Sequence, residues 1–126
     1  MIVGTGVDVI EPSRMREMIE RHGDRFLERI FTEGEVAYCK PRKRAAEHFA
    51  VRFAAKEAVG KALGTGIGSG VSWKDIDVVK EPSGKPTLVL TGGAARVAAT
   101  LGVTRTHVTL SHCEHSAIAV VVLEQE

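Results

Sequence analysis

The chain has 126 residues, a length that predicts one domain over residues 1–126. Its 44% hydrophobic and 26% charged residues are typical of a globular protein, and its net charge of +1 gives no overall attraction to nucleic acid. The longest apolar run, residues 117–123, is too short to span a membrane, and the N-terminus has no signal-peptide pattern. Cys39 and Cys113 match no CxxC spacing, so we expect a cytoplasmic protein.

The N-terminal residues predict a buried strand followed by an amphipathic helix. Residues 2–10 are β-prone and mostly apolar, and they carry one carboxylate, Asp8. Pro12 and Ser13 then begin a helix with apolar residues on one face and arginines on the other.

A short helix, a basic loop and a long helix are expected next. Thr32 and Glu35 fit the N-cap and N3 positions of a capping box. Residues 40–44 form a loop with a proline and several basic residues. The longest helix is predicted over residues 45–63 and is closed by Gly64.

The second half of the chain predicts strands around one more helix. Patterns of apolar residues indicate strands at residues 76–78, 88–90, 106–112 and 116–124. A turn at residues 83–86 joins the first two strands, a short turn joins the last two, and residues 94–101 predict a helix. These elements predict the α+β class, with one long central helix packed on an antiparallel sheet.

The long helix carries charges where a buried helix should have none. It is apolar or small on nearly every side, yet it contains Arg52, Lys56, Glu57 and Lys61. Because an unpaired buried charge is costly, these groups must pair, reach solvent or face a charged ligand. Glu57 and Lys61 have the i,i+4 spacing of a surface ion pair worth about 0.3–0.5 kcal/mol.

Asp8, inside an apolar strand, also requires a partner. An ion pair or a capped turn would satisfy it, and so would a hard cation. Mg²⁺ takes one or two protein carboxylates and completes its shell with water and phosphate oxygens. A strand aspartate and a helix glutamate near basic residues therefore suit a metal–phosphate site, if the fold brings them together.

Several motifs occur along the chain in a fixed order. They are GVDV at 6–9, FT at 31–32 with Glu35, RFAAKEA at 52–58, KALG at 61–64, GKP at 84–86 and HVTLSH at 107–112. Together they resemble the bacterial holo-acyl-carrier-protein synthases, a family of 4′-phosphopantetheinyl transferases. The resemblance implies a small α+β domain that forms a homotrimer. It also implies a Mg²⁺-dependent transfer of 4′-phosphopantetheine from coenzyme A to a serine of apo acyl carrier protein, for fatty acid biosynthesis.

The same resemblance implies roles for single residues. Asp8 and Glu57 correspond to the metal ligands, and Lys61 corresponds to a lysine that contacts phosphate. The positions that correspond to coenzyme A contacts are Arg52, Gly84, Lys85, Pro86 and His112. Arg44, in the basic loop, is our candidate for the 3′-phosphate of the coenzyme, although such a loop is more often simply exposed.

Glu57 is the candidate base for the serine proton, and His112 is the second candidate. His112 would otherwise be a strand-end histidine bonded to backbone. The sequence has Thr109 where serine is common in the family, and residues 113–115 depart from the family pattern and receive no role.

The first helix is the candidate docking surface for the carrier protein. The resemblance implies an acidic carrier, which Arg14, Arg21 and Arg25 would attract, with Met18 as an apolar anchor between them. Four interleaved glutamates favour a different interpretation, a solvated amphipathic helix.

Three other function classes receive less support. A phosphate-binding module would need a glycine loop between a strand and a helix, but residues 64–70 follow a helix. A zinc site built from His107, His112, Cys113 and His115 fits no standard spacing. An RNA-binding protein would need more aromatic residues than the 5% present.

Overall fold

The computed structural model describes all of residues 1–126 and contains four α-helices and five strands. In chain order the elements are β1 (Ile2–Ile10), α1 (Pro12–Ile30), α2 (Glu33–Cys39), α3 (Ala45–Leu63), the 3₁₀ turn η1 (Trp73–Asp75), β2 (Ile76–Lys80), β3 (Pro86–Leu90), α4 (Gly92–Leu101), β4 (Arg105–His112) and β5 (Ala117–Glu124). The α+β class and the long central helix are confirmed, and α4 begins two residues earlier than expected.

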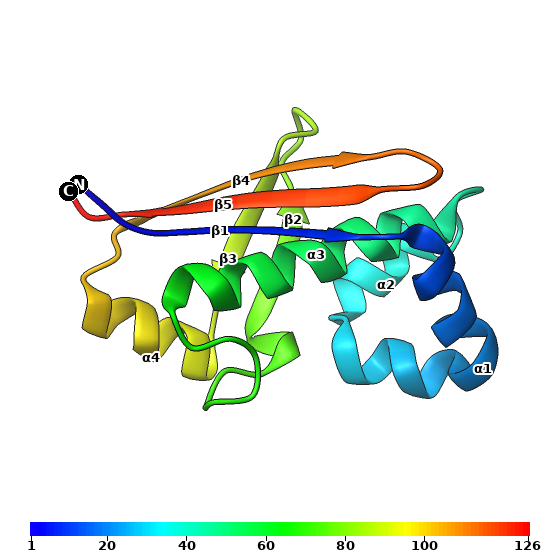
Figure 1. The fold of residues 1–126 in the computed structure, drawn as a ribbon, viewed down its shortest axis with the longest axis horizontal. Coiled ribbons are helices and arrows are strands. Elements are labelled where there is room, and N and C mark those ends of the chain that lie inside the picture. Colours follow the sequence, from blue (N-terminus) through cyan, green and yellow to red (C-terminus); the bar gives the residue numbers. More distant parts are fainter.

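Strands from opposite ends of the chain form the main sheet (Figure 1). Its order is β1-β5-β4, with both neighbouring pairs antiparallel. The expected pairing of β4 with β5 is confirmed, and β5 also pairs with β1, so the two termini lie side by side. The strands β2 and β3 pair with each other in a separate antiparallel sheet.

The helix α3 lies against the main sheet and is buried along most of its length. Its small residues allow close packing, and so do two glycines of β1. A Cβ atom at Gly6 would lie 2.0 Å from the carbonyl oxygen of Ala58, and one at Gly4 would lie 2.1 Å from that of Ala62. Only glycine at these two positions lets β1 approach the helix backbone so closely.

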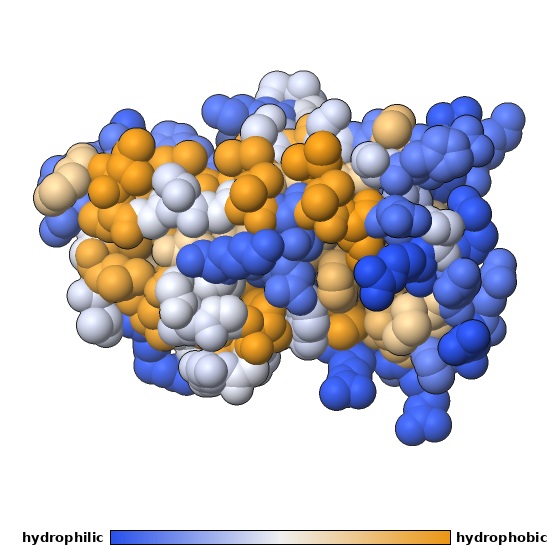
Figure 2. Space-filling view, viewed as in Figure 1, coloured by the Kyte–Doolittle hydropathy of each residue, from blue (hydrophilic) through white to orange (hydrophobic).

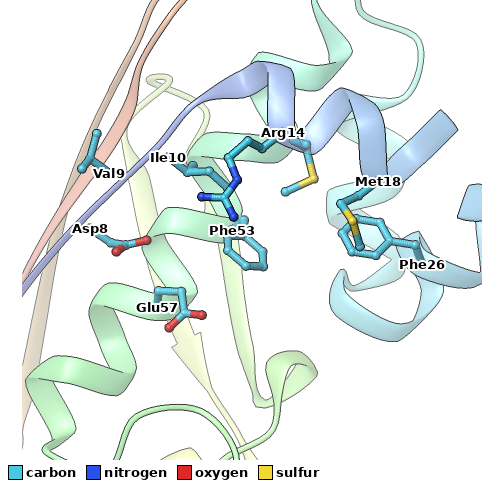
Figure 3. Close-up of a pocket in the computed structure, with 9 residues that line it drawn as sticks. Asp8, Val9, Ile10, Arg14, Met18, Phe26, Phe53 and Glu57 are labelled. Atoms are coloured by element: carbon cyan, nitrogen blue, oxygen red, sulfur yellow. The ribbon is translucent and has the colours of Figure 1, made fainter. Parts of the chain in front are cut away.

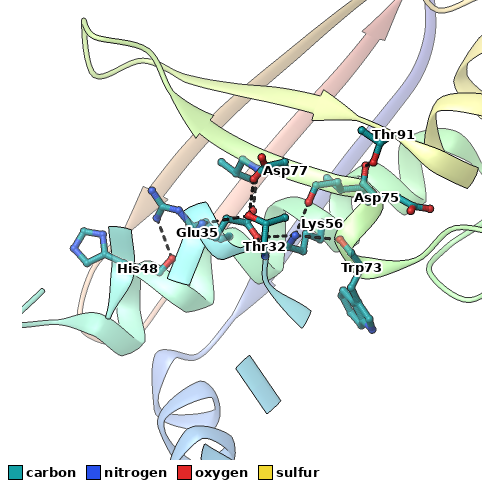
Figure 4. A network of polar contacts seen from close by, with 11 residues as sticks. Thr32, Glu35, His48, Lys56, Trp73, Asp75, Asp77 and Thr91 are labelled. Atoms are coloured by element: carbon teal, nitrogen blue, oxygen red, sulfur yellow. Dashed lines mark hydrogen bonds and ion pairs between the residues drawn. The ribbon is translucent and has the colours of Figure 1, made fainter. Parts of the chain in front are cut away.

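The capping box at Thr32 is confirmed, and its glutamate does more than cap the helix (Figure 4). Glu35 also accepts a hydrogen bond from the backbone N–H of Val78, and its carboxylate lies 2.8 Å from Nζ of Lys56. Lys56 in turn donates to the carbonyl oxygens of Trp73 and Ile76. This buried ion pair therefore joins α2, α3 and β2, and it satisfies one of the charges of the long helix.

The helix α1 is interrupted at Gly23, which the sequence pattern did not indicate. Gly23 has φ 57° and ψ −140°, far from helical values, while the residues on both sides are helical. Both segments of α1 contact a second apolar cluster that includes Phe31 and Phe49. Met15 belongs to the segment before Gly23, and Leu27 and Ile30 belong to the segment after it. The segment after Gly23 consequently runs in a different direction (Figure 1).

Candidate active site

Asp8 and Glu57 lie at one end of a cavity of about 490 Å³ (Figure 3). Asp8 comes from the face of β1 that packs on α3, because Gly6, two residues earlier, faces the helix backbone. Glu57 comes from α3 and is half-buried. Arg14, Met18 and Phe53 also line the cavity. Two carboxylates thus share a hollow that is otherwise mostly apolar.

The charges around this end of the cavity are coupled. Lys61 donates to Asp8 over 3.1 Å and to the carbonyl oxygen of Val7 over 3.0 Å. The simple i,i+4 pair of Glu57 with Lys61 is therefore wrong, because Lys61 pairs across to the strand. Partial burial, and then the negative charge of Asp8, raise the pKa of Glu57, whereas Lys61 opposes the rise.

The donor set can be tested against Mg²⁺. No cluster of three or more His, Cys, Asp or Glu side chains that could hold a metal is present. Asp8 and Glu57 supply two carboxylates with access to the cavity, which is the usual number for a Mg²⁺ ion that keeps water and substrate phosphate as its other ligands. Without a metal, partial burial and the charge of Asp8 raise the pKa of Glu57, and a cation bound between the two carboxylates would oppose that rise.

The docking residues expected on α1 border this cavity. Arg14 and Met18 line the cavity itself. Arg21 and Arg25 line a second hollow of about 560 Å³, and Met18 contributes to both. No arginine of α1 forms an ion pair, so the interleaved glutamates do not neutralise these arginines directly.

His112 belongs to a different cluster. Its Nδ1 atom lies 2.9 Å from a carboxylate oxygen of Glu47, and its ring contacts that of His48 with centroids 4.8 Å apart. His112 is therefore bonded to a carboxylate and not to backbone. Arg44 is exposed and lies 3.8 Å from the same Glu47. Burial, and then His112, lower the pKa of His48.

Arg52 lies next to this cluster and is buried, with 3% of its surface exposed. It donates to the carbonyl oxygen of His48, and its guanidinium lies 4.4 Å from the ring centroid of Tyr38. Its Nε is the one buried side-chain nitrogen or oxygen without a hydrogen-bond partner. A hydrogen bond from Lys80 over 2.8 Å, and then the charges of neighbouring cations, lower the pKa of Tyr38.

The structure does not bring all the sequence-predicted residues together within one chain. Glu47, the partner of His112, and Glu57 are ten residues apart on α3, which corresponds to about 15 Å along the helix. Gly84, with φ 92°, and Lys85 lie in the turn between β2 and β3, and Pro86 is the first residue of β3. Asp8, Glu57 and Lys61 therefore form one cluster, and His112, Arg44 and Arg52 form a second cluster.

Glu47 and Tyr38 were missed by sequence reasoning. Glu47 is an acidic residue in the first turn of a helix, a common position with no functional meaning of its own. Tyr38 is the only tyrosine, but nothing in the sequence shows that three cations surround its ring. The zinc alternative gains no support, because His107 pairs with Glu124 while His112 pairs with Glu47.

Known proteins resemble the chain over its whole length. The model of the 4′-phosphopantetheinyl transferase superfamily matches residues 4–121. A holo-[acyl-carrier-protein] synthase from Koribacter versatilis is 52% identical over 124 residues, which cover 98% of this chain and 99% of the relative.

Solved structures agree with this similarity. The holo-(acyl-carrier-protein) synthase of Bacillus anthracis, in complex with CoA (3′,5′-ADP), is 43% identical with a TM-score of 0.83, covering 100% of this chain and 99% of that one. The holo-[acyl-carrier-protein] synthase of Neisseria meningitidis is 32% identical with a TM-score of 0.90, covering 99% and 100%.

The chain belongs to the 4′-phosphopantetheinyl transferase superfamily and, within it, to the holo-[acyl-carrier-protein] synthases, which are transferases. The resemblance carried by the sequence motifs is thereby confirmed. No helix is both long enough and apolar enough to cross a bilayer.

Proposed function

We propose that this chain transfers 4′-phosphopantetheine from coenzyme A to a serine of an acyl carrier protein, with release of 3′,5′-ADP. The observation that carries the proposal is the cavity in which Asp8 and Glu57 stand together beside Lys61. The relatives named as holo-[acyl-carrier-protein] synthases, one of them in complex with CoA (3′,5′-ADP), support the same substrates. The resemblance extends the role to fatty acid biosynthesis.

The reaction exchanges a phosphoanhydride bond of coenzyme A for a phosphoester bond to the serine. The serine oxygen attacks the β-phosphorus of coenzyme A, and the bond from that phosphorus to the oxygen of 3′,5′-ADP breaks with its electron pair. Asp8 and Glu57 would hold Mg²⁺, which supplies charge neutralisation and orientation of the diphosphate when bound. Lys61 lies beside Asp8 and adds a positive charge for the same phosphate oxygens.

Glu57 is the proposed acceptor of the serine proton. Its carboxylate lines the cavity that the serine would enter, so it could accept the proton directly or through a water molecule. His112 is the second candidate, because its hydrogen bond with Glu47 fixes the orientation of its ring.

The arginines Arg14, Arg21 and Arg25, with Met18 between them, are the proposed docking residues for the acidic carrier protein. They are exposed, they have no ion-pair partner, and they extend from the cavity to the neighbouring hollow. Met18 and Phe26 line both hollows, so a carrier protein bound here would lie next to the cavity that contains Glu57.

We also propose a homotrimer in which two subunits complete each site. The outer face of the main sheet exposes apolar cross-strand pairs, Val7 with Val120 and Val9 with Ile118, and Figure 2 shows apolar side chains gathered in this region. Such a face favours contact with another subunit. The coenzyme contacts Arg44, Arg52, Gly84, Lys85, Pro86 and His112 would come from the neighbour of the subunit that supplies Asp8 and Glu57.

Mass spectrometry tests the proposed activity directly. Incubation of an apo acyl carrier protein with the enzyme, coenzyme A and Mg²⁺ should add one phosphopantetheine group to its serine and release 3′,5′-ADP. Omission of Mg²⁺ should abolish the reaction. An unmodified carrier protein under saturating conditions would contradict the proposal.

We place the enzyme in the cytoplasm, where its free cysteines Cys39 and Cys113 would remain reduced.

A further inference from the structure

Asp8 and Glu57, the two carboxylates of the proposed metal site, are held in different ways. Lys61 donates to Asp8 over 3.1 Å, whereas the carboxylate of Glu57 takes part in no hydrogen bond and in no ion pair. Packing alone must therefore fix the position of the Glu57 side chain. Phe53 lies one helical turn before Glu57 and lines the same cavity, so its ring limits the space open to that carboxylate (Figure 3).

The ring of Phe53 is supported by Trp73, the only tryptophan of the chain. The two rings are stacked, with centroids 4.9 Å apart and planes at 26° to each other. Trp73 does not line the cavity, so it supports the Phe53 ring from outside. It begins the turn η1, which is too short to be stable without contacts to the rest of the chain. Whatever fixes η1 against α3 consequently also fixes the wall of the cavity beside Glu57.

Lys56, the residue before Glu57, fixes η1 through its side chain (Figure 4). It is fully buried, and its Nζ donates to the carbonyl oxygens of Trp73, the first residue of η1, and of Ile76, the residue that follows η1. A carboxylate oxygen of Glu35, 2.8 Å away, is the third acceptor. The three protons of the ammonium group thus have three acceptors.

Stability alone is a weak reason for such a buried ion pair. The cost of desolvating two charges often exceeds their attraction, and well-packed apolar side chains of similar volume can serve a core equally well. A polar network in which every member is satisfied does hold its elements in one arrangement. Glu35 completes this network, because its carboxylate also accepts from the backbone N–H groups of Thr32 and Val78.

We infer that Lys56 and Trp73 are positioning residues for Glu57. Lys56 holds η1 against α3, and the Trp73 ring then supports the Phe53 ring that borders Glu57. Neither Lys56 nor Trp73 lines the cavity, so neither would touch the substrates. The inference rests on the proposed function, in which Glu57 binds the metal and accepts the serine proton, and it adds two residues from outside the cavity to that site.

The stack is tested in the whole enzyme with Trp73→Phe, which keeps a ring, and with Trp73→Leu, which does not. Trp73 is only partly buried, so both variants should fold. Lys56→Met removes the bonds to η1 and keeps a long unbranched side chain. Leu123→Ala is the matched control, because Leu123 is fully buried in the main core and has no part in the network. Thermal unfolding measures the stability of each variant, and all assays are run well below the lowest melting temperature.

Trp73→Leu should lower kcat about tenfold and Trp73→Phe less than about twofold, while the KM values for coenzyme A and for carrier stay within about twofold. Mn²⁺ binding without substrates, measured by electron paramagnetic resonance, should be about tenfold weaker in Trp73→Leu and unchanged in Trp73→Phe. Lys56→Met should lower kcat at least about tenfold, and adding Trp73→Leu to it should cost little more, because both changes act through the same stack. Leu123→Ala should lose as much thermal stability as Lys56→Met and keep kcat within about twofold.

The inference is overturned if Trp73→Leu keeps wild-type kcat or wild-type Mn²⁺ affinity, if Trp73→Phe loses as much as Trp73→Leu, or if Leu123→Ala loses as much kcat as Lys56→Met. A rise in the KM for carrier with kcat unchanged also overturns it, because the cavity wall would then serve carrier binding. If Lys56→Met or Leu123→Ala does not fold, the two Trp73 variants decide alone.

The same measurements separate this inference from the proposed function. Mn²⁺ affinity that depends on the ring at residue 73, in an enzyme that transfers no phosphopantetheine, contradicts the proposed function only. Transfer by an enzyme whose kcat and Mn²⁺ affinity do not depend on that ring contradicts this inference only.

Discussion

The charge of Glu57 at the proposed metal site depends on two neighbouring side chains, Asp8 and Lys61. Lys61 donates to Asp8, Asp8 raises the pKa of Glu57, and Lys61 opposes that rise. Two carboxylates so close together favour the binding of a cation, and a nearby lysine limits the repulsion when no cation is bound. The proposed metal site and the proposed base therefore share the same carboxylate, that of Glu57.

We expect Asp8→Asn and Glu57→Gln each to cost about 3–4 kcal/mol of transition-state stabilisation, or two to three orders of magnitude in kcat/KM. Each change removes one negative charge from the proposed Mg²⁺ site and keeps the shape of the side chain. The melting temperature should change little, because Asp8 and Lys61 form an accessible ion pair. Near-wild-type turnover of either variant at saturating Mg²⁺ would show that the metal assignment is wrong.

A second prediction concerns the titration of Glu57 in the metal-free enzyme. Burial and Asp8 raise its pKa, so NMR should record it above that of an ordinary glutamate. Asp8→Asn should move the pKa down, and Lys61→Met should move it up, because Lys61 opposes the rise. Movement in the opposite direction in either variant would refute this account.

Sequence reasoning at this scale found unusual charges but not their partners. Asp8 and Glu57 stood out because each is a carboxylate within an apolar element, and the structure does place both in one cavity. The partner of Lys61 was wrong, since the i,i+4 rule considers only the helix itself. Glu35 was identified as a cap, yet its bond to the buried Lys56 depends on the packing of α2 against α3.

At the scale of elements, the contact of β1 with α3 positions Asp8. Gly6→Ala would place a Cβ atom 2.0 Å from a carbonyl oxygen of α3, so the strand must move. We expect a destabilisation of about 1–3 kcal/mol and a large loss of kcat, because Asp8 is only two residues away. Gly4→Ala is the matched control, with a similar clash at 2.1 Å but twice as far along the chain from Asp8. The two variants should therefore lose similar stability in thermal unfolding, whereas Gly6→Ala should lose more kcat than Gly4→Ala. Equal losses of kcat would refute a positioning role for Gly6.

Sequence signals that depend on neighbouring residues predicted the helices and strands. The bend in α1 and the pairing of β1 with β5 were not predicted. The capping box at Thr32 and the closing Gly64 were correct because they depend on a few neighbouring residues. The bend at Gly23 was missed because a single glycine is tolerated in many helices, and the residues after it keep a helical pattern. The pairing of β1 with β5 was missed because it joins opposite ends of the chain, whereas a turn signal predicts pairing only between consecutive strands.

At the scale of the whole molecule, the two clusters of proposed site residues require an explanation. Asp8 and Glu57 lie at one cavity, whereas His112 contacts Glu47 about 15 Å away along α3. A second subunit would close this gap if its His112 faced the cavity of the first, and the exposed valines of β1 and β5 offer an apolar contact surface.

Complementation between two inactive variants tests this arrangement. Asp8→Asn and His112→Ala should each be inactive alone, and equal amounts should be mixed, dissociated and reassociated. In random trimers about one quarter of the subunit boundaries combine an intact Asp8 with an intact His112, so about a quarter of wild-type activity should return. A site built within one chain predicts no recovery, because every chain then carries one defect. Light scattering must show a trimer, and mass spectrometry of differently labelled subunits must show exchange. A monomer, or exchange without any return of activity, would rule out the shared site.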